Sequence, residues 1–346
     1  MGKTKILTAD TAGIAAAAAL LRAGRLVAFP TETVYGLGGD ALSPEAVAGI
    51  FAAKGRPAED PLIVHLADAA ELPLVAAQAP PAALRLAAAC WPGPLTLVLP
   101  RGAAVPHAVT AGRETVAVRV PAHPVARALL AAAGTPVAAP SANSFGHTSP
   151  TTAAHVLADL DGRIDAVLDG GPTPIGVEST VLDLTAPTPT LLRPGGVSLE
   201  RLRELLGEVA VGGRSAGEGE GMASPGLLER HYAPRSPMLL VAGEAGAALA
   251  WLRERAAAEQ AAGRRVGLLV PDEDAAALAD LGAECAPLGP AGDPEAVARR
   301  LYGALRALDA RRPDLILARD LGEAGLARAI GDRLARAAAG RVVRLN

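Results

Sequence analysis

A lysine and an arginine, Lys54 and Arg56, stand where a predicted helix ends and a loop begins. The chain has three lysines among 33 basic residues, and Lys54 is the only lysine after residue 5. A cation at a helix C-terminus complements the helix dipole, but arginine would serve that purpose equally well. A compact ammonium beside a planar guanidinium is instead typical of sites that bind phosphate oxygens. Since the sequence has no G-x-x-x-x-G-K-[ST] motif, we favour a phosphate site other than a Walker loop.

A second polar cluster follows a strand-like run, in "APSANSFGHTSPT" at residues 139–151. Such clusters are often simple Ser/Asn turns. Here, however, Asn143 is one of only two asparagines in the chain, which favours a specific role. The neutral donors and acceptors of Ser141, Asn143, Ser149 and Thr151 are of the kind that hold a nucleotide or an amino acid without adding charge.

Two predicted strands carry a polar side chain among apolar ones. In "TVAVRVP", alternation places Arg119 and Thr115 on the face opposite three valines. An arginine within a strand needs an anionic partner or an open cleft, unless its face is simply solvated, and both explanations stay open. In "PLIVHL", His65 lies on one face of the strand. A lone histidine in a strand is more often structural than catalytic.

Three further polar residue sets lie at the ends of predicted strands. "PTETVYGLG" predicts a substrate loop lined by Thr31, Thr33 and Tyr35, although a plain strand–loop connection would also explain it. "GVESTVLDL" and "LLRPGG" place Ser179 and Arg193 at sheet ends. Each of these signals is weak by itself.

The elements that must position these residues alternate between strand and helix patterns over residues 1–206. We expect strands at 25–33, 61–66, 93–100, 115–121, 136–140, 164–169, 179–184 and 190–194. We expect helices at 12–24, 43–55, 80–90, 123–133, 151–160 and 198–206. The helix that ends near Lys54 has Ser43 as its N-cap, Pro44 in its first turn and Gly55 as its stop. The pattern predicts one α/β domain around a central sheet.

The remaining residues divide into two parts. Residues 207–237 are rich in Gly, Ser and Pro without a period, which predicts a linker or lid that includes Tyr232. Residues 238–346 predict a smaller Rossmann-like α/β domain. It lacks G-x-G-x-x-G, so nucleotide binding there is unsupported. It also contains no histidine and no lysine, so we expect the chemistry in the first domain.

Composition limits the classes of protein that fit. A length of 346 residues is typical of two domains. A net charge of −3 and a pI near 6.1 argue against a protein whose main task is binding nucleic acid, although a local basic patch is compatible with them. Cys90 and Cys285 form neither a zinc motif nor a disulfide framework. We find no signal peptide and no stretch of transmembrane length, and expect a cytoplasmic protein without membrane contact.

Taken in order, "PTETVYGLG", "KGRP…PLIVH", "SAN…SPT", "GVESTV" and "LLRPG" resemble the YrdC-like family of threonylcarbamoyl-AMP synthases. The linker and the extra domain resemble the long, two-domain form of that family. The resemblance implies a YrdC-like twisted α/β sheet domain with a large, positively charged concave cavity, plus the smaller Rossmann-like C-terminal domain.

The resemblance also implies a reaction. L-threonine, bicarbonate or CO2 and ATP, the last with Mg²⁺, would give threonylcarbamoyl-AMP and diphosphate. The product would serve N6-threonylcarbamoylation of adenosine 37 in tRNAs that read codons starting with A. Contact with tRNA and with the downstream threonylcarbamoyl transferase complex are further expectations.

Carried over position by position, the family pattern assigns the catalytic role to Lys54 and Arg56. Its ATP contacts fall on Lys54, Arg56, Asp60, Thr115, Asn143, Thr151, Arg193 and Tyr232. Its threonine contacts fall on Thr33, His65, Arg119, Ser141 and Ser179. Two residues depart from the pattern. Asp60 stands where an asparagine is expected and either helps to hold Mg²⁺ or points away, and Phe145 replaces a small residue.

The implied chemistry needs positioning and charge neutralisation more than a protein nucleophile. An N-carboxylate of threonine would attack the α-phosphorus of ATP. Lys54 and Arg56 would stabilise the departing diphosphate, and Arg119 would pair with the substrate carboxylate. His65 is a candidate general base.

Two other functions are compatible with parts of the pattern. One is a non-catalytic RNA-binding module that uses the same cavity, which the net charge of −3 supports poorly. The other is a carbamoyl-transfer domain of hydrogenase maturation, whose usual cysteine-rich zinc modules are not matched by two isolated cysteines. The C-terminal domain would either order the linker as a lid carrying Tyr232 or provide a docking surface for the transferase.

Overall fold

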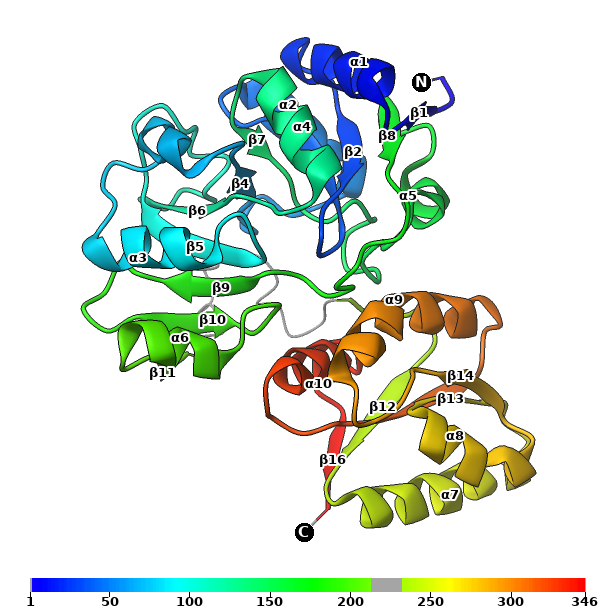
Figure 1. Ribbon diagram of the computed structural model, residues 1–346. Coiled ribbons are helices and arrows are strands. Elements are labelled where there is room, and N and C mark those ends of the chain that lie inside the picture. Colours follow the sequence, from blue (N-terminus) through cyan, green and yellow to red (C-terminus); the bar gives the residue numbers. More distant parts are fainter. Residues whose placement is uncertain (1, 213–231, 346) are drawn as a thin grey trace. The chain divides into compact units, whose positions relative to one another are not determined.

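The computed structural model describes residues 2–212 and 232–345, which form two compact units (Figure 1). The first unit holds the described residues up to 212, except 146–148 and 175–177. These two short segments pack with residues 232–345 in the second unit. Most of the linker or lid predicted at 207–237 lies outside the described residues. Among the described residues, no helix has the length and apolar character needed to cross a membrane.

The first unit is built on one mixed sheet of 11 strands, ordered β1-β8-β2-β3-β7-β4-β6-β5-β9-β10-β11. The strands are β1 Lys5–Thr8, β2 Val27–Pro30, β3 Tyr35–Asp40, β4 Ile63–His65, β5 Leu95–Pro100, β6 Thr115–Arg119, β7 Val137–Ala138, β8 Ala166–Asp169, β9 Thr180–Asp183, β10 Thr190–Arg193 and β11 Ala210–Val211. The predicted α/β domain around a large twisted sheet is confirmed.

Helices connect and cover these strands. They are α1 Thr11–Arg22, α2 Pro44–Lys54, α3 Pro81–Cys90, α4 Pro124–Ala133, α5 Ala153–Leu160 and α6 Leu199–Leu206, with a 3-10 helix at Ala69–Leu74. Helix α2 begins and ends as predicted. The Ser43 hydroxyl accepts from the Ala46 amide, and Gly55 takes the left-handed conformation at φ 64°. This glycine stop directs the chain into the loop that carries Arg56.

The two faces of the sheet are covered differently. On one face, α1 and α4 pack together over β2 and β8, with Leu21, Phe29 and Leu129 in their core (Figure 1). Helices α2, α3, α5 and α6 contribute to the large core on the opposite face. Residues paired across neighbouring strands point to the same side, so the pairing of His65 with Val137 puts His65 on the α1–α4 face. Arg119 is the partner of His65 across β4 and β6 and therefore lies on the same face.

The segment predicted as a substrate loop is in part a strand. Residues from Tyr35 onward form β3, antiparallel to β2. The prediction that Tyr35 lines a substrate loop is wrong, because its ring is fully buried and its hydroxyl donates to the Gly171 carbonyl at 2.8 Å. The glycines serve close packing, since a Cβ on Gly38 would lie 2.8 Å from the Phe29 ring.

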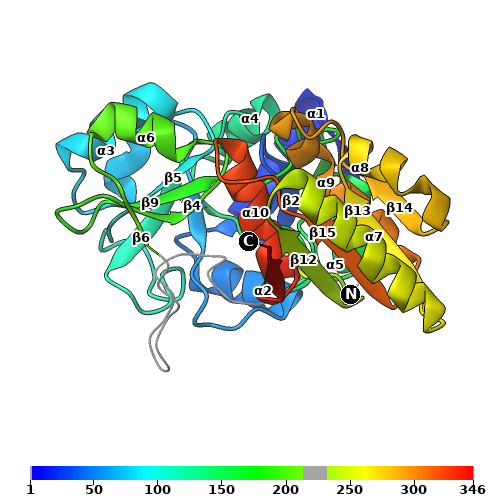
Figure 2. The ribbon, with the colours of Figure 1, turned by 90° about the horizontal axis from the view of Figure 1, so that it is seen from below.

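The second unit is a smaller sheet of five parallel strands, ordered β14-β13-β15-β12-β16. Its strands are β12 Met238–Ala242, β13 Val266–Val270, β14 Glu284–Pro287, β15 Leu315–Arg319 and β16 Val342–Arg344. Its helices are α7 Ala245–Ala261, α8 Asp272–Ala277, α9 Pro294–Ala310 and α10 Leu326–Ala337, with a 3-10 helix at Ala279–Leu281. Helices α7 and α8 lie on one face and α9 and α10 on the other (Figures 1 and 2). The Rossmann-like arrangement predicted for 238–346 is confirmed.

Candidate active site

Strand register brings two of the predicted site residues side by side. Strands β4 and β6 run parallel, and His65 is the direct partner of Arg119. The arginine is 3% exposed, so a solvated sheet face does not explain it. Its anionic partner is Glu32, whose Oε1 lies 2.7 Å from Nη2 of Arg119. A buried guanidinium is therefore held inside the first unit by a buried carboxylate.

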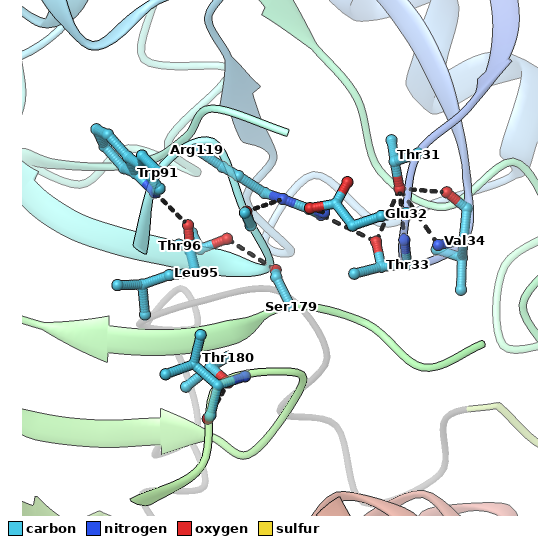
Figure 3. A network of polar contacts seen from close by, with 12 residues as sticks. Thr31, Glu32, Thr33, Val34, Trp91, Leu95, Thr96, Arg119, Ser179 and Thr180 are labelled. Atoms are coloured by element: carbon cyan, nitrogen blue, oxygen red, sulfur yellow. Dashed lines mark hydrogen bonds and ion pairs between the residues drawn. The ribbon is translucent and has the colours of Figure 1, made fainter. Parts of the chain in front are cut away.

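The rest of the Arg119 side chain is fixed by hydrogen bonds (Figure 3). Its Nε donates to the Gly93 carbonyl at 3.2 Å, and its Nη1 donates to Oγ1 of Thr33 at 3.0 Å. The hydroxyls of Thr33 and Thr31 are 2.8 Å apart. The turn after β2 thus supplies both a hydroxyl and a carboxylate to one guanidinium.

Ser179 joins this region from the end of β9. Its Oγ lies 2.8 Å from Oγ1 of Thr96 on β5 (Figure 3). The Nη2 atom of Arg193 donates to the Ser179 carbonyl at 2.9 Å and to its Oγ at 3.2 Å. Figure 3 shows Arg119 pointing toward Thr33 and Glu32, and the Ser179 hydroxyl pointing toward Thr96. Hydroxyls and one guanidinium in this arrangement suit a small polar substrate with a carboxylate.

His65 is a neutral imidazole in this environment. Its Nδ1 lies 3.2 Å from the Ile63 carbonyl, and its ring meets Phe29 edge to face. Burial, reinforced by the nearby charge of Arg119, lowers the pKa of His65 to about 3. A base this weak is poorly matched to accepting a proton near neutral pH. Its position suits packing and orientation of the site better than the general-base role.

Lys54 ends α2 and reaches into the segment 139–151. Its Nζ donates to the carbonyls of Ser141 and Asn143 at 2.5 and 2.6 Å. The side chain is almost completely buried. Burial and the neighbouring charge of Arg56 lower the pKa of Lys54 well below its usual value, while Asp60 opposes that shift. A dipole contact at a helix end would not require this burial, and binding of phosphate by Lys54 stays a prediction.

Arg56 and Asp60 form a buried ion pair four residues apart. Nη2 of Arg56 lies 2.8 Å from Oδ2 of Asp60, and Nε donates to the Asp60 carbonyl at 3.0 Å. Burial raises the pKa of Asp60, against the attraction of Arg56, Lys54 and Arg193. Asp60 therefore points into a group of three cations. The charges of Asp159 and Arg163, one of each sign, also act on Lys54, so basic side chains outnumber carboxylates in this region, which favours an anionic ligand.

Thr151, Thr115 and Tyr232 are also predicted ATP contacts. The buried hydroxyl of Thr151 lies 3.3 Å from Nδ1 of His155, and half-buried Thr115 begins β6. Tyr232 belongs to the second unit, where it packs against the Tyr302 ring at 5.9 Å and under the Arg333 guanidinium at 5.2 Å. Its contact with nucleotide stays a prediction.

Sequence reasoning missed two residues of this network, Glu32 and Thr96. Glu32 lies between the two threonines of "PTET", and Thr96 interrupts the apolar run "LTLVL". The useful signal was the need of Arg119 for an anionic partner, which could have directed attention to a nearby acid in a buried segment.

No cluster of three or more His, Cys, Asp or Glu side chains suited to hold a metal ion occurs within residues 2–212 and 232–345.

Comparison with known families gives two matches that follow one another along the chain. Residues 19–195 match the model of the Sua5, YciO and YrdC proteins, described as "Telomere recombination". Residues 197–339 match a model described as "Threonylcarbamoyl-AMP synthase, C-terminal domain".

Individual relatives agree with these matches. A Bacillus subtilis protein named threonylcarbamoyl-AMP synthase is 46% identical over 343 residues, covering 99% of this chain and 97% of the relative. A shorter relative with the same name, from Halorhodospira halophila, is 43% identical over 165 residues, which cover 46% of this chain and 86% of that protein. The crystal structure of Pyrococcus abyssi Sua5 complexed with L-threonine matches with a TM-score of 0.92 and 42% identity, covering 99% of this chain and 100% of that one.

Proposed function

The chain belongs to the Sua5, YciO and YrdC family of threonylcarbamoyl-AMP synthases, and from this premise we infer how the site of the first unit performs the reaction. The protein is a nucleotidyltransferase, an L-threonylcarbamoyladenylate synthase. It converts L-threonine, bicarbonate or CO2 and ATP into threonylcarbamoyl-AMP and diphosphate for N6-threonylcarbamoylation of tRNA.

One observation supports our placement of the two substrates. Two differently built groups of side chains are linked through Arg193. On one side, Arg193 donates to the carbonyl and hydroxyl of Ser179. On the other side, its charge acts on Asp60, the ion-pair partner of Arg56. A site for threonine beside a site for phosphates would place the two substrates for direct transfer.

We place L-threonine against Arg119 and its surrounding hydroxyls. The guanidinium would donate hydrogen bonds to the substrate carboxylate, because a guanidinium binds a carboxylate through two parallel N–H groups. Thr33, Ser179 and the Ser141 segment would supply hydroxyl and backbone contacts. His65 would pack beside them as a neutral ring.

We place the triphosphate of ATP against Lys54, Arg56 and Arg193. The threonine amine would add to CO2 with loss of a proton, or to bicarbonate with loss of water, and so give an N-carboxylate. An oxygen of the N-carboxylate would attack the α-phosphorus while the bond to the departing diphosphate breaks. Charge then moves onto the diphosphate, and fixed cations in a site shielded from water stabilise it with little reorganisation. Asn143, Thr115, Thr151 and Tyr232 remain proposed contacts of the nucleotide.

Mg²⁺ would arrive with ATP as part of the substrate, coordinated by its phosphates. The side chains of the cation cluster would then bind a partly neutralised triphosphate. Asp60, which faces Arg56, is oriented to temper the positive charge of this cluster.

Two partners remain proposals. The labile adenylate would pass to a threonylcarbamoyl transferase complex that acts on tRNA, and direct tRNA contact is a second expectation. We propose that this takes place in the cytoplasm.

The test is turnover of ATP to diphosphate with each substrate omitted in turn. We expect diphosphate release to require both L-threonine and bicarbonate, and Lys54→Ala to abolish it. Release that proceeds equally well without threonine would contradict the proposed placement of both substrates in one reaction.

A further inference from the structure

Glu32 is a buried carboxylate at the centre of the proposed threonine site. It is 6% exposed and lies on the turn after β2 that also carries Thr33 (Figure 3). Figure 3 shows its carboxylate directed toward the Arg119 guanidinium. The substrate placement proposed above assigns no group of threonine or ATP to this carboxylate.

The contacts of this carboxylate leave acceptor capacity unused. Its principal contact is the ion pair of Oε1 with Arg119 at 2.7 Å. Beyond that pair, the backbone N–H groups of Glu32 and Ala122 lie close enough to lower the pKa of the carboxylate, but neither carboxylate oxygen makes a hydrogen bond of good geometry to a described residue. Nη2 of Arg119 likewise makes no hydrogen bond of good geometry within the described part of the chain. A buried carboxylate has about four acceptor sites, and leaving them unfilled is costly. A bound molecule that donates hydrogen bonds would remove this cost.

The carboxylate is ionised in the folded protein. Although burial works in the opposite direction, the Arg119 charge and hydrogen bonding lower the pKa of Glu32 below its ordinary value. The site therefore presents a fixed positive and a fixed negative charge side by side.

This pair matches the charges of a free amino acid. At neutral pH the α-carboxylate of threonine is negative, and its α-ammonium group is positive because the amine pKa is about 8 or higher. If Arg119 receives the carboxylate, the ammonium group needs an anion nearby, since an unpaired buried cation is strongly disfavoured. Neutral hydroxyls of Thr33 and Ser179 cannot meet that need alone.

We propose that Glu32 is the binding residue for the α-ammonium group of L-threonine. The proposal rests on the proposed function and adds one residue to its amino-acid site. Glu32 then binds the positive α-ammonium group of the substrate, and Arg119 binds its negative α-carboxylate. The enzyme prefers a zwitterionic 2-amino acid over the 2-hydroxy acid of the same shape, and the reacting nitrogen is held at a fixed point.

The test compares two ligands by calorimetry without ATP. They are L-threonine and 2,3-dihydroxybutanoate of matching stereochemistry, in which a hydroxyl replaces the ammonium group. We expect wild type to bind threonine more tightly. We expect Glu32→Gln to weaken threonine binding by about ten- to hundredfold, the range for a hydrogen bond to a charged group. Binding of the hydroxy acid should stay equal or become tighter, because Arg119 loses its internal partner.

Two further variants complete the design. Glu32→Asp keeps the charge and should keep the preference for threonine. Exposed Glu208 gives a matched control, since Glu208→Gln also removes one negative charge and should leave both affinities unchanged.

Three outcomes would overturn the inference. The first is that Glu32→Gln weakens the binding of both ligands equally, which would mean that Glu32 acts only by orienting Arg119. The second is that threonine binds to this variant as tightly as to wild type. The third is that wild type binds the two ligands with equal affinity. If wild type bound no threonine at all, the proposed function itself would be contradicted, and the same titration distinguishes that result.

Discussion

At the scale of single residues, the site depends on charges held away from water. Four side chains are each no more than 7% exposed, namely Lys54, Arg56, Arg119 and Arg193. Each is held by a carbonyl or a carboxylate, which for Arg56 lies in its own loop and for the others in another segment. Such side chains lose little freedom on ligand binding, because their geometry is already fixed. Changes of charge or shape at these positions should therefore affect the reaction, and a change that leaves a buried ion-pair partner uncompensated should also lower stability.

The first prediction concerns the shape of the cation at position 54. Lys54→Arg keeps the charge, but a planar guanidinium cannot reproduce a compact ammonium that donates to the carbonyls of Ser141 and Asn143. We expect kcat/KM for ATP to fall at least about tenfold, as misplacement of a charge in a preorganised site does. Steady-state diphosphate release measures it, with Lys54→Ala as the inactive reference. Full activity of the arginine variant would show that charge alone matters here.

The second prediction concerns the anion in the cation cluster. Asp60→Asn removes a negative charge beside Arg56, Lys54 and Arg193 but keeps the size of the side chain. We expect a lower KM for ATP, by about two- to fivefold, since the triphosphate no longer competes with an internal carboxylate. The KM for threonine should change less. An increase in the KM for ATP would instead mean that the ion pair is needed to orient Arg56.

The third prediction follows from the lowered pKa of His65. Its folded pKa of about 3 lies below the unfolded value of 6.5, so the unfolded chain binds the extra proton between these two pH values. The stability that depends on the neutral ring is complete above pH 6.5 and is lost as pH falls toward 3. The loss approaches about 1.4 kcal/mol for each pH unit in that range.

Denaturant unfolding at several pH values measures this effect. His65→Asn should reduce the slope of stability against pH below 6.5, whereas His107→Asn, whose parent side chain is 57% exposed, serves as the control. Identical slopes for wild type and His65→Asn would show that His65 titrates normally.

At the scale of elements, the sheet brings residues distant in sequence to one place. His65 and Arg119 are neighbours only because β4 and β6 pair in parallel, and Thr96 meets Ser179 because β5 lies beside β9. The alternation of each strand, read from the sequence, already gave the face on which Arg119 lies. Strand order and register depend on pairing across the whole first unit, so the sequence alone could not join these faces.

The same limit explains the errors of prediction. Helix α2 was readable because Ser43, Pro44 and Gly55 are local signals that act within one turn. Strand β3 was missed because its glycines resemble a loop, while their actual role is to admit Phe29 and Val137 from other strands. Glu32 was missed for a related reason, since its importance lies in a partner 87 residues away. Long-range packing decides both cases.

The fourth prediction tests this packing role of glycine. A Cβ at Gly38 would lie 2.8 Å from the Phe29 ring and 3.0 Å from the Val137 side chain. We expect Gly38→Ala to destabilise the protein by about 1–3 kcal/mol, the usual cost of an overpacked core. Chemical denaturation gives this value. Gly49→Ala in α2 is the matched control, because its Cβ would meet Leu26 at an ordinary 3.5 Å and alanine favours a helix. Equal stability of both variants would contradict the packing explanation.

At the scale of the whole molecule, the two units carry different kinds of residues. The side chains around Arg119 and Lys54 lie in the first unit, and residues 232–345 of the second unit contain neither lysine nor histidine. The second unit also includes residues 146–148, which directly precede Ser149 in the chain, and residues 175–177, which end two positions before Ser179. Within it, Arg306 donates to the Thr148 carbonyl. An ordering role for the second unit and a docking role for the transferase both stay predictions.

The central claim is that one site joins threonine, bicarbonate and ATP into a single adenylate. Mass spectrometry of the products after incubation with ATP, L-threonine and ¹³C-labelled bicarbonate tests it most directly. We expect threonylcarbamoyl-AMP that carries one labelled carbon, formed together with diphosphate and lost in Lys54→Ala. Diphosphate released with AMP alone, or an adenylate without the labelled carbon, would contradict it.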